Sequence, residues 1–208
     1  YKNVRAGEDT WAVDINEAKD VFESLSEKHG YKDWNFKEKH RFKSTTGVDF
    51  EISLEQMLSL YAYSKREQAY DHMTEGGFTF DTGRTYKSKE NGKTYVHKKL
   101  SSTYRISEEN LSRIISSLTA EQRKYVDTMQ KFLTEFAKHG NKASRTLYGI
   151  DLFTEENYFP LFSEQDFRNS TEQDLNNTQT MVSLKESGMT KQTKPGANNP
   201  IVLRAFDD

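Results

Sequence analysis

Cysteine is absent from the sequence, and proline occurs only three times in 208 residues. Without cysteine the chain can form no disulfide, no thiolate metal site and no cysteine nucleophile. No run approaches the roughly 18 consecutive apolar residues of a membrane-spanning helix, and no charged and apolar leader opens the chain. We therefore expect no membrane partner, and a reducing compartment fits the composition.

Neither sign of charge is in excess. The 30 basic and 32 acidic residues leave a formal net charge of −2, unlike a generally basic nucleic-acid binder, but a local basic patch is compatible with it. Hydrophobic residues make up only 34% of the chain, which predicts a thin core. The 13 Phe and 11 Tyr residues offset this, because each aromatic ring removes a large area from water.

Motifs of common enzymes are missing as well. There is no glycine-rich phosphate loop, no GxGxxG dinucleotide motif, no HExxH zinc motif and no GxSxG nucleophile elbow. The five histidines include no tight pair that would indicate a metal site. These absences favour a protein that is not an enzyme, without requiring it, and the sequence predicts neither a cofactor nor a metal.

The pattern from Ser53 to Gly77 predicts a central helix. Ser53 and Gln56 have the spacing of a capping box, and glycine follows where the helix should stop. Large side chains on two faces are typical of a helix with neighbours on more than one side. The main apolar stripe consists of Leu54, Met57, Leu58 and Tyr61.

The same stripe becomes polar in its second half, at Lys65, Gln68 and His72. Lysine is seldom buried, so one interpretation is that this end of the helix emerges into solvent. The other is a polar pocket, which would make these three residues the candidate catalytic site of a hydrolase or transferase.

The periodicity changes after Gly77. Alternation over residues 78 to 100, with a turn at 81–83 and the hairpin signal Asn91-Gly92, predicts a small β-element inserted between helices. This most basic stretch of the chain could bind nucleic acid, or it could be a solvated hairpin whose lysines discourage strand pairing at its edge. The candidate nucleic-acid-binding residues are Arg84, Tyr86, Lys87, Lys89, Lys93, Tyr95, Lys98 and Lys99.

Residues 31–50 hold a second mixture of aromatic and basic side chains, including Trp34, Phe36, Lys39 and Arg41. Such a mixture can stack bases and neutralise phosphates. It is also the composition of a loop held to the core by its aromatic rings.

Two further helices are predicted in the second half of the chain. The first begins at Ser107, and the second begins at Thr119 and is expected to end at Gly140. The second carries the longest apolar stripe of the sequence, which we expect to lie in the core from Tyr125 to Ala137.

The composition becomes polar after Phe162, where Gln, Asn, Thr and Ser dominate. Such a segment should wrap the body as a long arm, and Ile201–Leu203 could pair as a final strand. The predicted fold is mainly α: a helical domain over 1–162 with a β-hairpin insertion at about 78–100, and an extended C-terminal arm over 163–208 that packs on it.

Several short sequence motifs resemble segments of the very large polyvalent proteins of bacteriophages and conjugative elements. They include the run from Leu58 to Ala69, Gly76-Gly77, Asn157-Tyr-Phe-Pro160 and Gly188-Met-Thr-Lys191, within a span of roughly 45–203. The resemblance implies a domain of a larger polypeptide that is delivered with DNA. It also implies a location in the cytoplasm of a bacterial host or in the virion. A first residue other than Met agrees with such an origin.

The leading functional prediction is a non-enzymatic structural or interaction module of such a polyvalent protein. Three alternatives stay open. They are a nucleic-acid-binding module that uses the basic hairpin over 84–99, a hydrolase or transferase with a site near His72, and an inhibitor of a host defence protein. The expected partners are the rest of the polypeptide, nucleic acid or a host protein.

Overall fold

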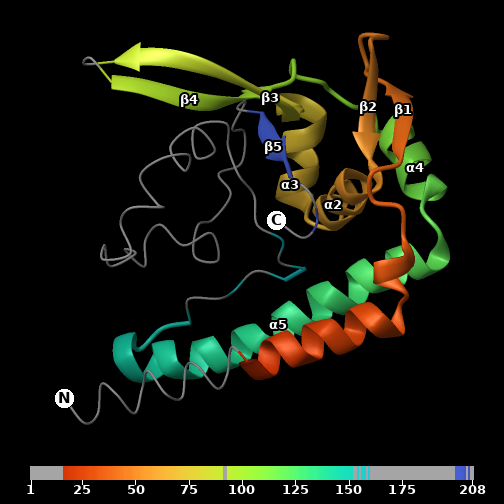
Figure 1. The fold of residues 1–208 in the computed structure, drawn as a ribbon. Coiled ribbons are helices and arrows are strands. Elements are labelled where there is room, and N and C mark those ends of the chain that lie inside the picture. Colours follow the sequence, from red (N-terminus) through yellow and green to blue (C-terminus); the bar gives the residue numbers. More distant parts are fainter. Residues whose placement is uncertain are drawn as a thin grey trace.

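The computed structural model describes residues 16–90 and 93–151, the single residues Thr154, Glu156, Asn157 and Phe159, and residues 200–204 with Phe206. An N-terminal helix is described over 16–28. The other helical elements are η1 (Tyr31–Asp33), α2 (Leu54–Ser64), α3 (Glu67–Asp71), the π-helical turn η2 (His72–Gly76), α4 (Glu108–Ser117) and α5 (Ala120–Tyr148). The strands are β1 (Lys39–Lys43), β2 (Asp49–Ser53), β3 (Phe78–Glu90), β4 (Lys93–Leu100) and β5 (Ile201–Leu203) (Figure 1).

The fold is mixed rather than mainly α, as 53% of the described residues are helical and 22% lie in strands. The hairpin insertion and the two helices of the second half are present, whereas the single helix predicted over Ser53–Gly77 is divided into α2, α3 and η2. The prediction underestimated the strands because β1 was not foreseen, and β1 pairs with β2 in a second antiparallel sheet. Most of the predicted arm over 163–208 lies outside the described residues, but its Ile201–Leu203 strand is confirmed.

Helix α2 occupies the centre of the fold, as its sequence pattern predicts. The capping box is formed, with the Ser53 Oγ accepting from the Gln56 N–H and the Gln56 side chain accepting from the Ser53 N–H. Leu58, Leu60 and Tyr63 are all fully buried, although they point in different directions around the helix. Helix α2 can bury them because α3, α4, α5, β2 and β5 all pack against it.

Strand β3 is the middle strand of the larger sheet, whose order is β4-β3-β5. It pairs in parallel with β5, with Phe78 opposite Ile201. Gly77, directly before β3, has φ +84, and a Cβ atom there would lie 2.6 Å from the carbonyl oxygen of Tyr104. Only glycine fits this position, because the backbone of Tyr104 passes so close to Gly77 that no side chain has room.

Helix α5 differs from the prediction in two respects. It continues through Gly140 to Tyr148 and ends at Gly149, which has the left-handed φ of 73° that suits a helix end. A single internal glycine costs a helix only about 1 kcal/mol, too little to stop it. The expected core stripe is also shorter, since Tyr125 and Met129 are buried whereas Phe132 is only half-buried.

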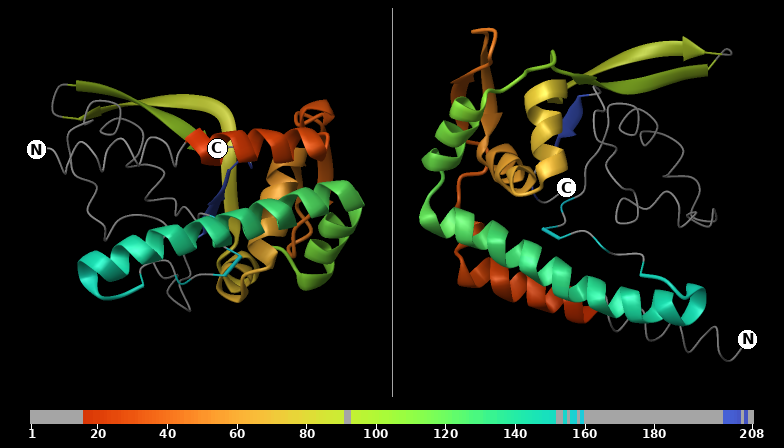
Figure 2. Two further views of the ribbon diagram at one scale, coloured as in Figure 1. Left: turned by 90° about the horizontal axis from the view of Figure 1, so that it is seen from below. Right: turned by 180° about the vertical axis from the view of Figure 1, so that it is seen from behind.

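The N-terminal helix runs alongside α5 in the opposite direction (Figure 2). Ser26 lies within hydrogen-bond distance of the Tyr125 hydroxyl, at 3.2 Å, and the buried His29 lies 3.3 Å from a carboxylate oxygen of Glu121. Figure 1 shows the β3–β4 hairpin projecting from the opposite end of the body. The β3–β4 hairpin therefore projects from the helical body.

Candidate nucleic-acid interface

A β-bulge divides β3 into a buried root and an exposed ribbon. The pairing register with β4 shifts between Asp81 and Arg84, and Gly83 has φ 72°. Thr82 Oγ1 donates to the Lys99 carbonyl oxygen at 2.6 Å, and the Gly83 N–H donates to an Asp81 carboxylate oxygen at 2.8 Å. The turn predicted at 81–83 is therefore a bulge within one long strand, and a bulge bends its strand and redirects the residues beyond it.

Beyond the bulge, residues 84–90 of β3 pair with residues 93–99 of β4 alone. We call this two-stranded segment the ribbon. From 84 to 99 it carries six basic residues and one acidic residue, a local net charge of +5 in a chain of net charge −2. Among the described side chains of the ribbon, all except Ser88 are exposed, including Tyr86 at 42% and Val96 at 45%.

The register assigns the described ribbon residues to two faces. Residues directly opposite each other in an antiparallel pair project to the same side, and sides alternate along each strand. One face therefore holds Arg84, Tyr86 and Ser88 with Lys99, and we call it the Arg84 face. The other face, the Lys87 face, holds Thr85, Lys87, Lys89, Thr94 and Val96.

Three of the candidate residues are placed by backbone pairing only. Lys93 lies opposite Glu90, Tyr95 opposite Ser88, and Lys98 opposite Thr85. Their side chains lie outside the described part of the structure, as do the turn residues 91 and 92.

The cations of the ribbon lack acidic partners among the described residues. Arg84, Lys87, Lys89 and Lys99 make no ion pair with any other side chain that the structure describes. Charges that are exposed and unmatched leave a positive potential that attracts polyanions.

The second basic stretch behaves differently. On the exposed side of the β1–β2 sheet, Arg41 Nη2 lies 2.9 Å from Glu51 Oε1, and Lys43 stands opposite Asp49 in the register. The rings of Trp34 and Phe36 turn inward to the core, where Trp34 packs edge-on against Tyr125. Residues 31–50 therefore form a segment held to the core by its aromatic rings, in which Arg41 is paired with Glu51.

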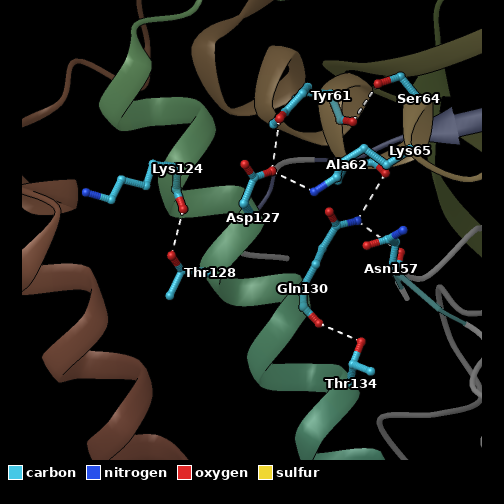
Figure 3. Close-up of polar contacts among 10 residues, drawn as sticks. All are labelled: Tyr61, Ala62, Ser64, Lys65, Lys124, Asp127, Thr128, Gln130, Thr134 and Asn157. Carbon is cyan, nitrogen blue, oxygen red and sulfur yellow. Dashed lines mark hydrogen bonds and ion pairs between the residues drawn. The ribbon is translucent and has the colours of Figure 1, made fainter.

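Two of the three residues of the predicted polar site near the end of α2, Lys65 and His72, are not brought together among the described contacts. Lys65 Nζ lies 2.6 Å from Asp127 Oδ1 of α5, and the Tyr61 hydroxyl donates to the same oxygen at 2.9 Å (Figure 3). Burial, together with the hydrogen bond to Asp127 and its negative charge, raises the pKa of Tyr61 to about 12. Lys65 thus serves as the partner of a carboxylate at a helix–helix junction.

His72 lies apart from this pair in the π-helical turn. It is 9% exposed, and its Nδ1 atom has no hydrogen-bond partner among the residues that the structure describes. Within the same described ranges no hydrogen bond or ion pair joins it to Lys65, and the side chain of Gln68 lies outside them. A general base acts on a proton within hydrogen-bond reach, and no described contact between Lys65 and His72 provides one.

Sequence reasoning missed Gln130, a buried polar residue at this junction. Gln130 is 1% exposed and donates from Nε2 to the carbonyl oxygens of Ala62, at 3.1 Å, and Asn157, at 2.9 Å (Figure 3). Arg66 adds a bond to the Phe159 carbonyl oxygen at 3.2 Å. The only sequence signal was a glutamine directly beside the apolar stripe of α5. Gln130 thereby joins Asn157 to α2.

A small hollow of about 160 Å³ lies between the N-terminal helix and the second half of α5. Its lining is mostly apolar and comprises Glu17, Ala18, Val21, Phe132, Phe136 and His139. Within the part of the chain that the structure describes, no three His, Asp or Glu side chains gather in a way that could hold a metal ion. No described helix combines the length and the apolar character needed to cross a membrane.

Comparison with protein-family models, with curated proteins and with solved structures found no match for the chain. The resemblance to polyvalent proteins of mobile elements therefore stays a prediction. What the protein does is best inferred from the one described feature in which exposure, charge and shape coincide, which is the ribbon.

Proposed function

We propose that the chain is a non-enzymatic interaction module that binds nucleic acid through the β3–β4 ribbon. The observation that carries the proposal is the set of exposed cations on a projecting ribbon, without described acidic partners. Residues 31–50 receive less support, because their aromatic rings pack inward and Arg41 is already paired with Glu51.

The ribbon has suitable dimensions for this role. Its paired part from Arg84 to Glu90 is roughly 20 Å long at about 3.4 Å per residue. Phosphates of one strand in duplex DNA follow each other at about 3.4 Å along the axis, so the ribbon can run beside several of them. Each phosphate that a Lys or Arg neutralises releases counterions, which makes affinity fall as salt rises.

The wider context belongs to the proposal as well. A nucleic-acid-binding ribbon suits a domain of a polyvalent protein that is delivered with DNA to a bacterial host. Such an origin is what the short sequence motifs suggest. A hydrolase or transferase near His72 gains no support, because Lys65 is bound to Asp127 and is not joined to His72. No described surface favours the host-defence inhibitor specifically.

The test is fluorescence anisotropy of labelled DNA and RNA, titrated with the purified chain at two salt concentrations. We expect affinity to fall with salt, and binding to be lost when Lys87, Lys89, Lys93, Lys98 and Lys99 are replaced by Ala. The matched control replaces five exposed lysines elsewhere by Ala, namely Lys28, Lys37, Lys124, Lys131 and Lys142, which removes the same charge. Absence of binding at low salt, or equal losses in both variants, would refute the proposal.

A further inference from the structure

We infer that the ribbon binds single-stranded nucleic acid, and that the strand lies along the Arg84 face. This inference rests on the proposed function and adds the class of partner and the binding side. It derives from the separation of the ribbon residues into two faces of similar charge but different side-chain type.

On the Arg84 face, an exposed aromatic ring lies next to a pair of cations. Tyr86 is 42% exposed and is two residues from Arg84 on the same strand, a spacing of about 7 Å. Lys99 stands directly opposite Arg84 and is exposed. A ring beside two cations at this spacing can stack a base while the cations neutralise the adjoining phosphates.

The root of the ribbon holds this face in place. Arg84 is the first residue after the bulge, and the Lys99 carbonyl oxygen accepts the Thr82 hydroxyl bond at 2.6 Å. The backbone of both cations is therefore held at the root of the ribbon, with Tyr86 one step further out. A fixed arrangement reduces the ordering cost of binding.

The Lys87 face offers charge without a described aromatic ring. Its exposed described side chains include Lys87, Lys89 and Val96. It can attract phosphates but provides no described ring for stacking. The two faces therefore differ in what they can recognise: both attract a polyanion, and only the Arg84 face suits unpaired bases.

The accessibility of the bases distinguishes a single strand from a duplex as the partner of this face. In a duplex each base face is covered by its neighbours in the stack, whereas a single strand can present bases to a protein ring. Stacking on an aromatic side chain typically changes affinity by roughly five- to 150-fold per base. DNA and RNA share this chemistry, and separate probes distinguish them.

The experiment compares a labelled single-stranded DNA, a single-stranded RNA of the same sequence and the corresponding DNA duplex, all titrated by anisotropy. We expect at least about fivefold tighter binding to one of the single strands than to the duplex. Tyr86→Ala should remove this preference while the duplex affinity and the salt dependence stay unchanged. Tyr86→Phe, which keeps the ring, should retain the preference.

A charge-matched pair of variants tests the face assignment. Arg84→Ala/Lys99→Ala and Lys87→Ala/Lys89→Ala each remove two cations from the same ribbon, and thermal unfolding of each checks that the fold is intact. We expect the first pair to weaken single-strand binding several-fold more than the second. Equal losses, or a duplex bound as tightly as the single strands, would overturn this inference while the proposed function stands. Absence of binding to all three probes would overturn both.

Discussion

Lys65 at the end of α2 and Asp127 in α5 form an ion pair 62 positions apart in the sequence, with 2.6 Å between Nζ and Oδ1. The Lys65 side chain is 26% exposed and that of Asp127 is 46% exposed, so solvent screens the pair. The pair joins two packed helices of the body but contributes little of the free energy that holds them together.

We predict a small coupling between these two residues. A double-mutant cycle with Lys65→Met and Asp127→Asn should give an interaction energy of about 0.2–1 kcal/mol from urea unfolding, because exposed ion pairs contribute that much. The coupling should shrink at high salt. A coupling of several kcal/mol that does not respond to salt would contradict the prediction.

Tyr61 should make stability pH-dependent at alkaline pH. Its pKa in the folded chain is raised to about 12 from an ordinary value of 10, so the folded state retains the phenol proton more strongly than the unfolded state does. The contribution is fully present below pH 10 and is lost as the pH rises towards 12. Unfolding of wild type and Tyr61→Phe across this range should show a larger loss in wild type, and ultraviolet titration should detect the late tyrosinate.

Gly77 should be the least replaceable glycine described. Gly77→Ala places a methyl group 2.6 Å from the Tyr104 carbonyl oxygen in a backbone of φ +84, and we expect a loss of about 3 kcal/mol or more. Gly47→Ala is the matched control, because Gly47 also has positive φ, at +79, but its Cβ would meet nothing within 4 Å. Its cost should be about 1–2 kcal/mol, from backbone strain alone. If denaturant unfolding gave the same loss of stability for both variants, the contact with the Tyr104 carbonyl oxygen would not be what excludes a side chain at Gly77.

Gln130→Met should cost about 1–3 kcal/mol. The substitution keeps the approximate volume but leaves the carbonyl oxygens of Ala62 and Asn157 without their side-chain donor. Thr134→Val serves as the control, since it removes only a bond to a backbone carbonyl one turn earlier in α5, and should change stability by about 0.5 kcal/mol or less. Amide exchange near Asn157 should quicken in Gln130→Met and stay unchanged in the control.

The two halves of α5 should respond differently to truncation. Met129→Ala removes a side chain that is 1% exposed and should cost about 2–5 kcal/mol. Phe132→Ala removes a larger but half-buried ring and should cost about 1.5 kcal/mol. Equal losses from unfolding would mean that the apolar stripe of α5 is a continuous core, as the sequence alone predicts.

Local patterns allowed much of the fold to be predicted. The capping boxes at Ser53 and Thr119 form with both of their bonds, because each involves residues only three apart. The hairpin and its basic character were also predictable from alternation and composition. The misjudged end of α5 has a local cause too, since Gly140 alone is a weak stop signal.

Relationships between distant segments were not predictable from one sequence. The pairing of Phe78 with Ile201 depends on where two remote segments meet, and so does the contact of Lys65 with Asp127. The candidate interface was likewise predictable in part. Its cations were evident from composition, but their separation into two faces required the register that starts at the bulge before Arg84.

The parallel pairing of β3 with β5 has a consequence for the order in which the chain folds. The root of the ribbon is held by Ile201–Leu203, and the adjacent Arg204 carbonyl accepts a bond from Ser59, 145 positions earlier. Contacts at such separation form slowly, because a long loop must close first. During synthesis the N-terminal helix, α2 and the hairpin emerge from the ribosome well before β5 exists. The ribbon is thus made early and fixed to the body late, when the last strand arrives.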